Sequence, residues 1–131
     1  MPVITPLYAA VATLMLISLS VRVIGMRRRR RVSIGDGEDE ILTRRIRAQG
    51  NFIEYVPMAL VLLLLLELGG ASAWLLHGLG IALLAGRLVH AWSLAAHNGT
   101  GRMIGMGLTF GVLVVAAISN LEAALGVAIF G

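Results

Sequence analysis

Long apolar stretches alternate with short polar or glycine-containing breaks along the 131-residue chain. About 20 apolar residues in a helix are enough to cross the hydrocarbon core of a bilayer. We therefore expect spanning helices over about residues 3–26, 40–68, 73–96 and 102–129. The pattern predicts an all-α integral membrane four-helix bundle that forms a single domain, residues 1–131.

Composition agrees with a membrane protein and leaves no room for a large water-soluble domain. Hydrophobic residues make up 58% of the chain and charged residues 14%, whereas soluble domains average about 25% charged residues. Cysteine is absent from the sequence, which excludes a disulfide framework, a thiolate metal site and a cysteine nucleophile. Any thiol chemistry therefore requires a thiol on a bound molecule.

The basic residues are all arginines, and five of them form one run at residues 27–31, directly after the first apolar stretch. A basic run in this place more often orients a protein in the membrane or contacts anionic lipid than binds nucleic acid. The N-terminal tail and the second loop contain no arginine. The positive-inside rule thus predicts cytoplasmic first and third loops, with both termini on the opposite side.

Polar residues recur at helical spacing in the second stretch. At about 100° per residue, five of them lie together with Met58 within an arc of about 100°. These six are Arg44, Arg47, Asn51, Glu54, Tyr55 and Met58. In lipid, such a stripe must face the bundle interior, a subunit interface or a water-filled pocket. An ion pair between Arg47 and Glu54 that only holds the bundle together is the simpler alternative, although buried ion pairs add little net stability.

A matching stripe runs along the third stretch, and the fourth stretch begins with another arginine. The third-stretch residues are Arg87, His90, Leu94 and His97, and the fourth begins at Arg102. Arginine binds carboxylates bidentately, a carboxylate accepts an ammonium group, and a neighbouring cation lowers the pKa of a thiol. These stripes favour a small peptide-like thiol. No metal is expected, because the three histidines are spread over about 30 Å of helix.

Glycines in the fourth stretch repeat a spacing of four residues. The pairs are Gly101 with Gly105 and Gly107 with Gly111. Small residues at this spacing let another helix approach closely, so we interpret them as packing residues.

The string Arg47-Ala48-Gln49-x-Asn51-x-x-Glu54-Tyr55, followed by Pro57 and a leucine-rich run, resembles the signature of the MAPEG family. These are the membrane-associated proteins in eicosanoid and glutathione metabolism. The resemblance covers nearly the whole chain and is strongest to small bacterial inner-membrane members. It implies a homotrimer that holds glutathione between neighbouring subunits on the cytoplasmic side.

The resemblance also implies roles for individual residues. The expected glutathione contacts are Arg47, Gln49, Asn51, Glu54, Tyr55, Arg87 and His90. One arginine of 27–31 is expected to add a carboxylate contact, and Arg102 is the expected catalytic residue that stabilises the glutathione thiolate. By helical periodicity Gln49 lies on another face of its helix. Leu94 and Met106 stand where family enzymes often carry tyrosines.

Three functions remain open at this point. The leading hypothesis is a glutathione transferase or peroxidase that acts on lipophilic electrophiles, with glutathione as co-substrate. The alternative is a non-catalytic lipid- or thiol-binding membrane scaffold of the same fold, which the missing tyrosines favour. A small anion transporter comes third, because paired internal repeats are absent from the sequence. Expected partners are glutathione, a lipophilic small molecule, membrane lipid and further copies of the chain, without nucleic acid.

Overall fold

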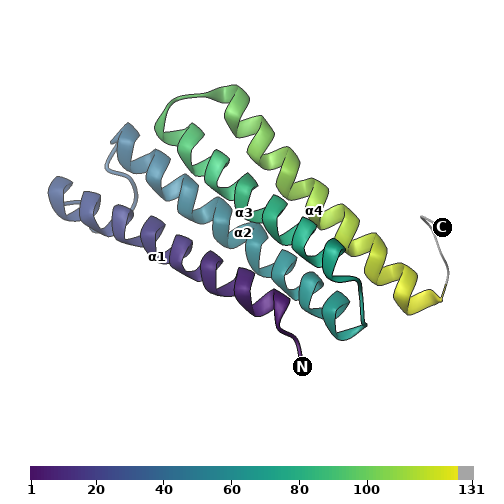
Figure 1. The fold of residues 1–131 in the computed structure, drawn as a ribbon. Coiled ribbons are helices and arrows are strands. Elements are labelled where there is room, and N and C mark those ends of the chain that lie inside the picture. Colours follow the sequence, from purple (N-terminus) through teal and green to yellow (C-terminus); the bar gives the residue numbers. More distant parts are fainter. Residues whose placement is uncertain (127–131) are drawn as a thin grey trace.

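A computed structural model of the chain describes residues 1–126 and shows them as helices joined by short loops (Figure 1). The helices are α1 (Ile4–Arg30), α2 (Glu40–Leu68), α3 (Ala73–Ala95) and α4 (Gly99–Leu125). All of them are long and apolar enough to cross a membrane. The prediction of an all-α bundle of four membrane-length helices is confirmed.

Two helix boundaries differ from the expected ones. Helix α1 continues past residue 26 into the arginine run and ends where Arg31 adopts a left-handed conformation with φ 57°. Arginines fit this last turn because they interact favourably with the negative end of the helix dipole. Helix α4 begins at Gly99, before residue 102, because the Asn98 side chain accepts a hydrogen bond from the Gly101 amide at 2.9 Å and caps the helix. The expected end at residue 129 lies outside the described residues.

Helices α2 and α3 occupy the middle of the bundle, with α1 beside them on one side and α4 on the other (Figure 1). The most extensive helix contact is between α3 and α4, and α1 and α4 do not touch within the described part of the chain. The core is apolar, and its fully enclosed side chains include Ala59, Leu63, Leu83 and Ala116, each with 0% of its surface exposed.

Glycines bring α3 and α4 unusually close. A Cβ atom added to Gly105 would lie 2.8 Å from the Gly86 carbonyl oxygen and 2.8 Å from the His90 backbone nitrogen. Nothing lies within 4 Å of a Cβ added to Gly107 or Gly111. Of the two glycine pairs, the one that contains Gly105 therefore packs against another helix within the chain.

The bundle has two different ends. We call the end formed by loops 31–39 and 96–98 the arginine-rich end, and the opposite end the far end. At the arginine-rich end, Arg30 Nε lies 2.9 Å from the carboxylate of Asp39. Asp39 also caps α2 by accepting a hydrogen bond from the Leu42 amide at 2.8 Å. The ion pair therefore connects the end of α1 to the beginning of α2.

At the far end, polar groups bind one another. The Glu67 carboxylate accepts hydrogen bonds from the backbone amides of Val3, Ile4 and Thr5 at 2.6, 2.7 and 2.7 Å. These amides open α1 and have no partner within their own helix. The Tyr8 hydroxyl lies 2.8 Å from His77 Nδ1. Glu67 thus caps α1 from the end of α2.

Candidate functional site: a cationic pocket between α2, α3 and α4

A pocket of about 280 Å³ lies between α2, α3 and α4 at the arginine-rich end. We call it the polar pocket. Its lining residues are Arg47, Asn51, His90, Leu94, Arg102 and Met106. None of these described residues carries a carboxylate, so two guanidinium groups face one small space without a negative charge in its wall. This arrangement favours an anionic ligand.

Helix α2 supplies one wall of the polar pocket. Arg47 and Asn51 are one turn apart and therefore share a face. Arg47 Nη1 lies 3.9 Å from Glu54 Oε1, and the two side chains are 59% and 50% exposed. An ion pair this long and this exposed contributes at most about 1 kcal/mol. The geometry argues against a purely structural role for the pair and leaves both groups accessible to a ligand.

Arg87 forms the floor beneath this wall. Its side chain is 2% exposed, and its guanidinium donates hydrogen bonds to Asn51 Oδ1 and, at 3.2 Å, to the Gly105 carbonyl. A further contact reaches Met106 Sδ at 3.5 Å. All three partners are uncharged, so the positive charge of Arg87 is not neutralised by the groups that bind it. Arg87 therefore fixes Asn51 in place and adds positive potential under the pocket.

His90 and Arg102 complete the pocket from α3 and α4. His90 is 4% exposed and lies one turn from Arg87. Arg102 is exposed in the first turn of α4 and forms no ion pair with a carboxylate of residues 1–126. No three histidine, aspartate or glutamate side chains in that part of the chain gather closely enough to hold a metal ion.

Tyr55 lies next to the pocket and does not line it. Its ring packs edge-on against Phe110 of α4, with 5.3 Å between the ring centroids. Leu94 and Met106, the positions where family enzymes often carry tyrosines, do line the pocket. The pocket wall is thus less polar than tyrosines would make it.

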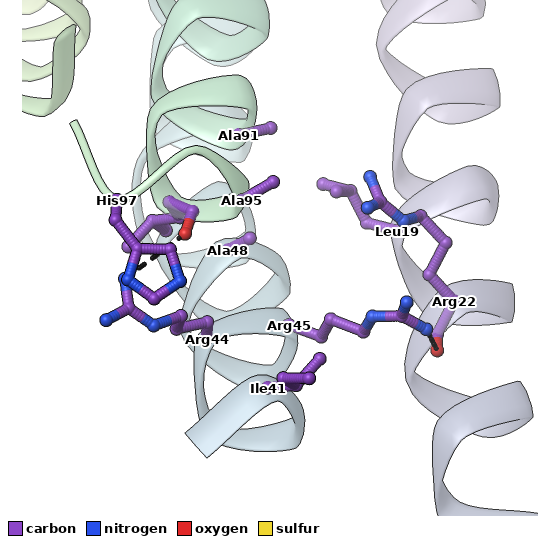
Figure 2. A pocket seen from close by; sticks show the side chains of 10 residues that line it. Leu19, Arg22, Ile41, Arg44, Arg45, Ala48, Ala91, Ala95 and His97 are labelled. Carbon is purple, nitrogen blue, oxygen red and sulfur yellow. Dashed lines mark hydrogen bonds between the residues drawn. The ribbon is translucent and has the colours of Figure 1, made fainter. Parts of the chain in front are cut away.

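Three polar residues that the sequence analysis assigned to the stripes or to the glutathione site lie outside the polar pocket. Gln49 donates a hydrogen bond to the Ser20 hydroxyl of α1 at 2.8 Å, so it faces away from the polar pocket of its own chain. Arg44 and His97 line a different pocket, between α1, α2 and α3 (Figure 2). Grouping these two with the polar-pocket residues as two continuous stripes was wrong. His97 follows the end of α3 in a left-handed conformation, φ 57°, where helical spacing no longer applies.

This second pocket, which we call the alanine-walled pocket, was not predicted from the sequence. Besides Arg44, it is lined by Arg22 of α1 and Arg45 of α2. The available signal was Arg22 itself, which interrupts the apolar pattern of the first stretch before the arginine run begins.

The fold and the pocket together define a small membrane protein with four membrane-length helices and a cationic pocket at one end. The chain belongs to the MAPEG family, whose model matches residues 5–121. It is similar to the inner membrane protein YecN of Escherichia coli K12, with 39% identity over 118 residues that cover 90% of each chain. The protein of the same name from Escherichia coli O6:H1 strain CFT073 gives the same identity and coverage. The name of this relative gives a location and no reaction.

Proposed function

We propose that this protein binds glutathione in the polar pocket and uses it as a transferase or peroxidase on lipophilic electrophiles. The observation that supports the proposal best is a pocket with two arginines in its wall, a third beneath it and no carboxylate among its lining residues. Family membership adds support, because the family includes proteins of glutathione metabolism. The inner-membrane location of the relative supports the same location for this chain.

Charge complementarity supports glutathione as the ligand. Glutathione has two carboxylates, an ammonium group and a thiol. In the proposed complex, Arg47 binds a carboxylate and the exposed Glu54 carboxylate takes the ammonium group. Asn51, held by Arg87, orients the peptide part of the ligand. Each hydrogen bond to a charged group contributes about 1.5–3 kcal/mol.

Arg102 is the proposed catalytic residue. A guanidinium beside the thiol stabilises the thiolate and lowers the thiol pKa from about 8.5. In the transferase reaction, the thiol proton leaves to solvent and the thiolate sulfur forms a bond to the electrophilic carbon. The leaving group departs with its electron pair. In the peroxidase reaction, two glutathione molecules are oxidised to the disulfide while the hydroperoxide is reduced to an alcohol and water.

Assembly is part of the proposal. Arg47 and Glu54 are half exposed on a membrane-length helix, where uncovered charges are costly. A homotrimer in which a neighbouring subunit covers this face removes that cost. Gln49, which faces α1 in its own chain, contacts glutathione across the subunit interface in this arrangement. The positive-inside rule supports a cytoplasmic position for the arginine-rich end.

A non-catalytic glutathione-binding or lipid-binding scaffold is the second candidate. The observation that favours it is the apolar pair Leu94 and Met106 in the pocket wall. A scaffold and an enzyme both bind glutathione, so turnover separates them.

The test measures thiolate formation and turnover in detergent-solubilised protein. With glutathione bound, the wild type is expected to show the ultraviolet absorbance of a thiolate at neutral pH and to conjugate chlorodinitrobenzene faster than solvent does. Arg102→Ala should lose both signals while S-methylglutathione, which has no thiol, still binds. Arg45→Ala, which removes an arginine that lines the other pocket, is the matched control. Binding without thiolate or turnover in the wild type would favour the scaffold.

A further inference from the structure

The alanine-walled pocket has a volume of about 230 Å³ and lies on the other side of the α2 and α3 pair from the polar pocket. Ala48 of α2 and Ala91 and Ala95 of α3 point toward α1, and Leu19 of α1 faces them across the space (Figure 2). Ala91 and Ala95 are one turn apart, so their short side chains leave room on two consecutive turns. An apolar cavity excludes water and can be filled by an apolar group.

Three arginines line the pocket together with these apolar side chains. Arg45 Nη1 donates to the Arg22 carbonyl oxygen at 3.0 Å and so joins α2 to α1 through an uncharged acceptor. Neither Arg22 nor Arg45 forms an ion pair with a carboxylate in residues 1–126. The positive charge of both arginines is therefore not neutralised within the described part of the chain.

Arg44 is the third cation of the pocket, and its hydrogen bonds do not include its Nε. Its Nη2 binds Glu40 Oε1 at 2.5 Å, and its Nη1 reaches the Leu94 carbonyl at 3.4 Å. Its Nε is buried and has no partner among the described residues. A buried donor without an acceptor costs about 1–3 kcal/mol, so the protein groups around Arg44 do not fully satisfy its guanidinium.

We propose that the alanine-walled pocket binds the phosphate group of an anionic phospholipid, with the first part of an acyl chain against the alanines. Guanidinium groups bind phosphate bidentately. The pocket lies at the ends of membrane-length helices, the depth at which lipid headgroups are found. A free phosphate ion would satisfy the arginines and leave the apolar wall empty, whereas a phospholipid covers both. The proposal does not depend on glutathione binding.

Native mass spectrometry of delipidated protein in detergent provides the test, with phosphatidylglycerol, phosphatidylcholine and inorganic phosphate as probes. Wild type is expected to retain one phosphatidylglycerol per chain at least about tenfold more tightly than phosphatidylcholine, because both lipids carry a phosphate but the arginines of the pocket repel the quaternary ammonium group of phosphatidylcholine. Inorganic phosphate should not displace the lipid. Equal retention of both lipids, or displacement by phosphate at the same concentration, would overturn the proposal.

Two variants assign the effect to this pocket. Arg45→Ala removes a cation, and Ala95→Leu fills the wall without changing the charge. Each should weaken phosphatidylglycerol retention by about tenfold. The matched controls are Arg47→Ala, which removes an arginine of the polar pocket, and Ala117→Leu on the exposed face of α4, and both should retain the lipid as wild type does.

Folding is checked for each variant by its helical circular dichroism. If Arg45→Ala fails to fold, Arg22→Gln replaces it as the charge variant. The lipid retention of Arg22→Gln and Ala95→Leu then tests the proposal. Wild-type retention in the folded pocket variants would show that the lipid binds elsewhere and would contradict the proposal.

Discussion

The two pockets at the arginine-rich end share a wall and differ in the groups that surround their arginines. Leu94 lines both of them. In the polar pocket, the buried side chain of Arg87 holds Asn51 from beneath. In the alanine-walled pocket, Arg45 is held by a backbone carbonyl, and the apolar part of the wall is formed by three alanines together with leucine and isoleucine side chains. Arginines close together in sequence thus belong to sites of different chemistry.

The difference teaches that charge alone does not define a site in this bundle. Arg45 and Arg47 are two residues apart on α2, and at about 100° per residue they point to nearly opposite sides of the helix. The side chains that support each arginine determine whether its pocket suits a small polar ligand or an amphiphile. A preorganised polar floor favours a ligand with several hydrogen-bonding groups, while an apolar wall favours a hydrocarbon chain.

The largest predicted effect concerns the floor of the polar pocket. Asn51→Leu removes the side-chain acceptor of the buried Arg87 guanidinium and should lower the free energy of unfolding by about 3 kcal/mol. The double variant with Arg87→Met should recover most of this loss, because neither polar partner is then left alone. Chemical unfolding in detergent micelles measures both. If the double variant were no more stable than Asn51→Leu, the loss of stability in Asn51→Leu would not come from leaving the Arg87 guanidinium without its acceptor.

The next effect concerns the close contact of α3 and α4. These two helices enclose the polar pocket together with α2, whereas α4 does not line the alanine-walled pocket. Gly105→Ala places a methyl group 2.8 Å from His90 and the Gly86 carbonyl, and such overpacking costs about 2 kcal/mol. Gly107→Ala, with nothing within 4 Å, should be neutral or stabilise the helix by up to about 1 kcal/mol. Equal melting temperatures for the two variants would contradict the packing of Gly105.

A smaller change at the far end should spare both pockets. Glu67→Gln removes the charge that three α1 amides share and should lower the free energy of unfolding by less than Gly105→Ala does. Glutathione and phosphatidylglycerol binding should stay at wild-type levels. Loss of either ligand would mean that the two ends of the bundle are coupled. Glu38→Gln in the exposed loop is the control.

The smallest predicted effect is a pH dependence in the loop between α1 and α2. The Glu38 amide and the Thr43 hydroxyl donate hydrogen bonds to Asp36 and hold the pKa of its carboxyl below the usual range. A depressed carboxyl pKa stabilises the fold above the ordinary value of about 3.9, and the stabilisation is lost as pH falls through the folded pKa. The melting temperature of the wild type should therefore fall more between pH 5 and pH 3 than that of Asp36→Asn. We expect the difference to be on the order of a few degrees at most.

The helices could be predicted from the sequence because hydrophobic length determines what spans a bilayer. The start of α4 was harder to predict from the sequence. Asn98, Gly99 and Gly101 are typical of a loop by composition, yet the Asn98 side chain caps the helix and begins it before Arg102. Local composition does not show whether an asparagine will act as a cap.

The polar pocket was predictable as a set of positions and not as a structure. Helical spacing grouped Arg47 with Asn51 and Arg87 with His90, and the fold places these pairs at one pocket. The same spacing grouped Arg44 with Arg47, although the boundary between the two pockets runs between them. The burial of Arg87 depends on contacts between three helices, which periodicity within one helix does not contain. The glutathione contacts themselves stay predictions.

The most direct test of the central claim is a calorimetric titration of glutathione into detergent-solubilised wild type, Arg47→Ala and Arg45→Ala. The two variants remove the same group from opposite sides of α2. Wild type is expected to bind, Arg47→Ala to bind at least about tenfold more weakly, and Arg45→Ala to bind as wild type does. No binding to the wild type, or equal weakening by the two substitutions, would contradict a glutathione site in the polar pocket.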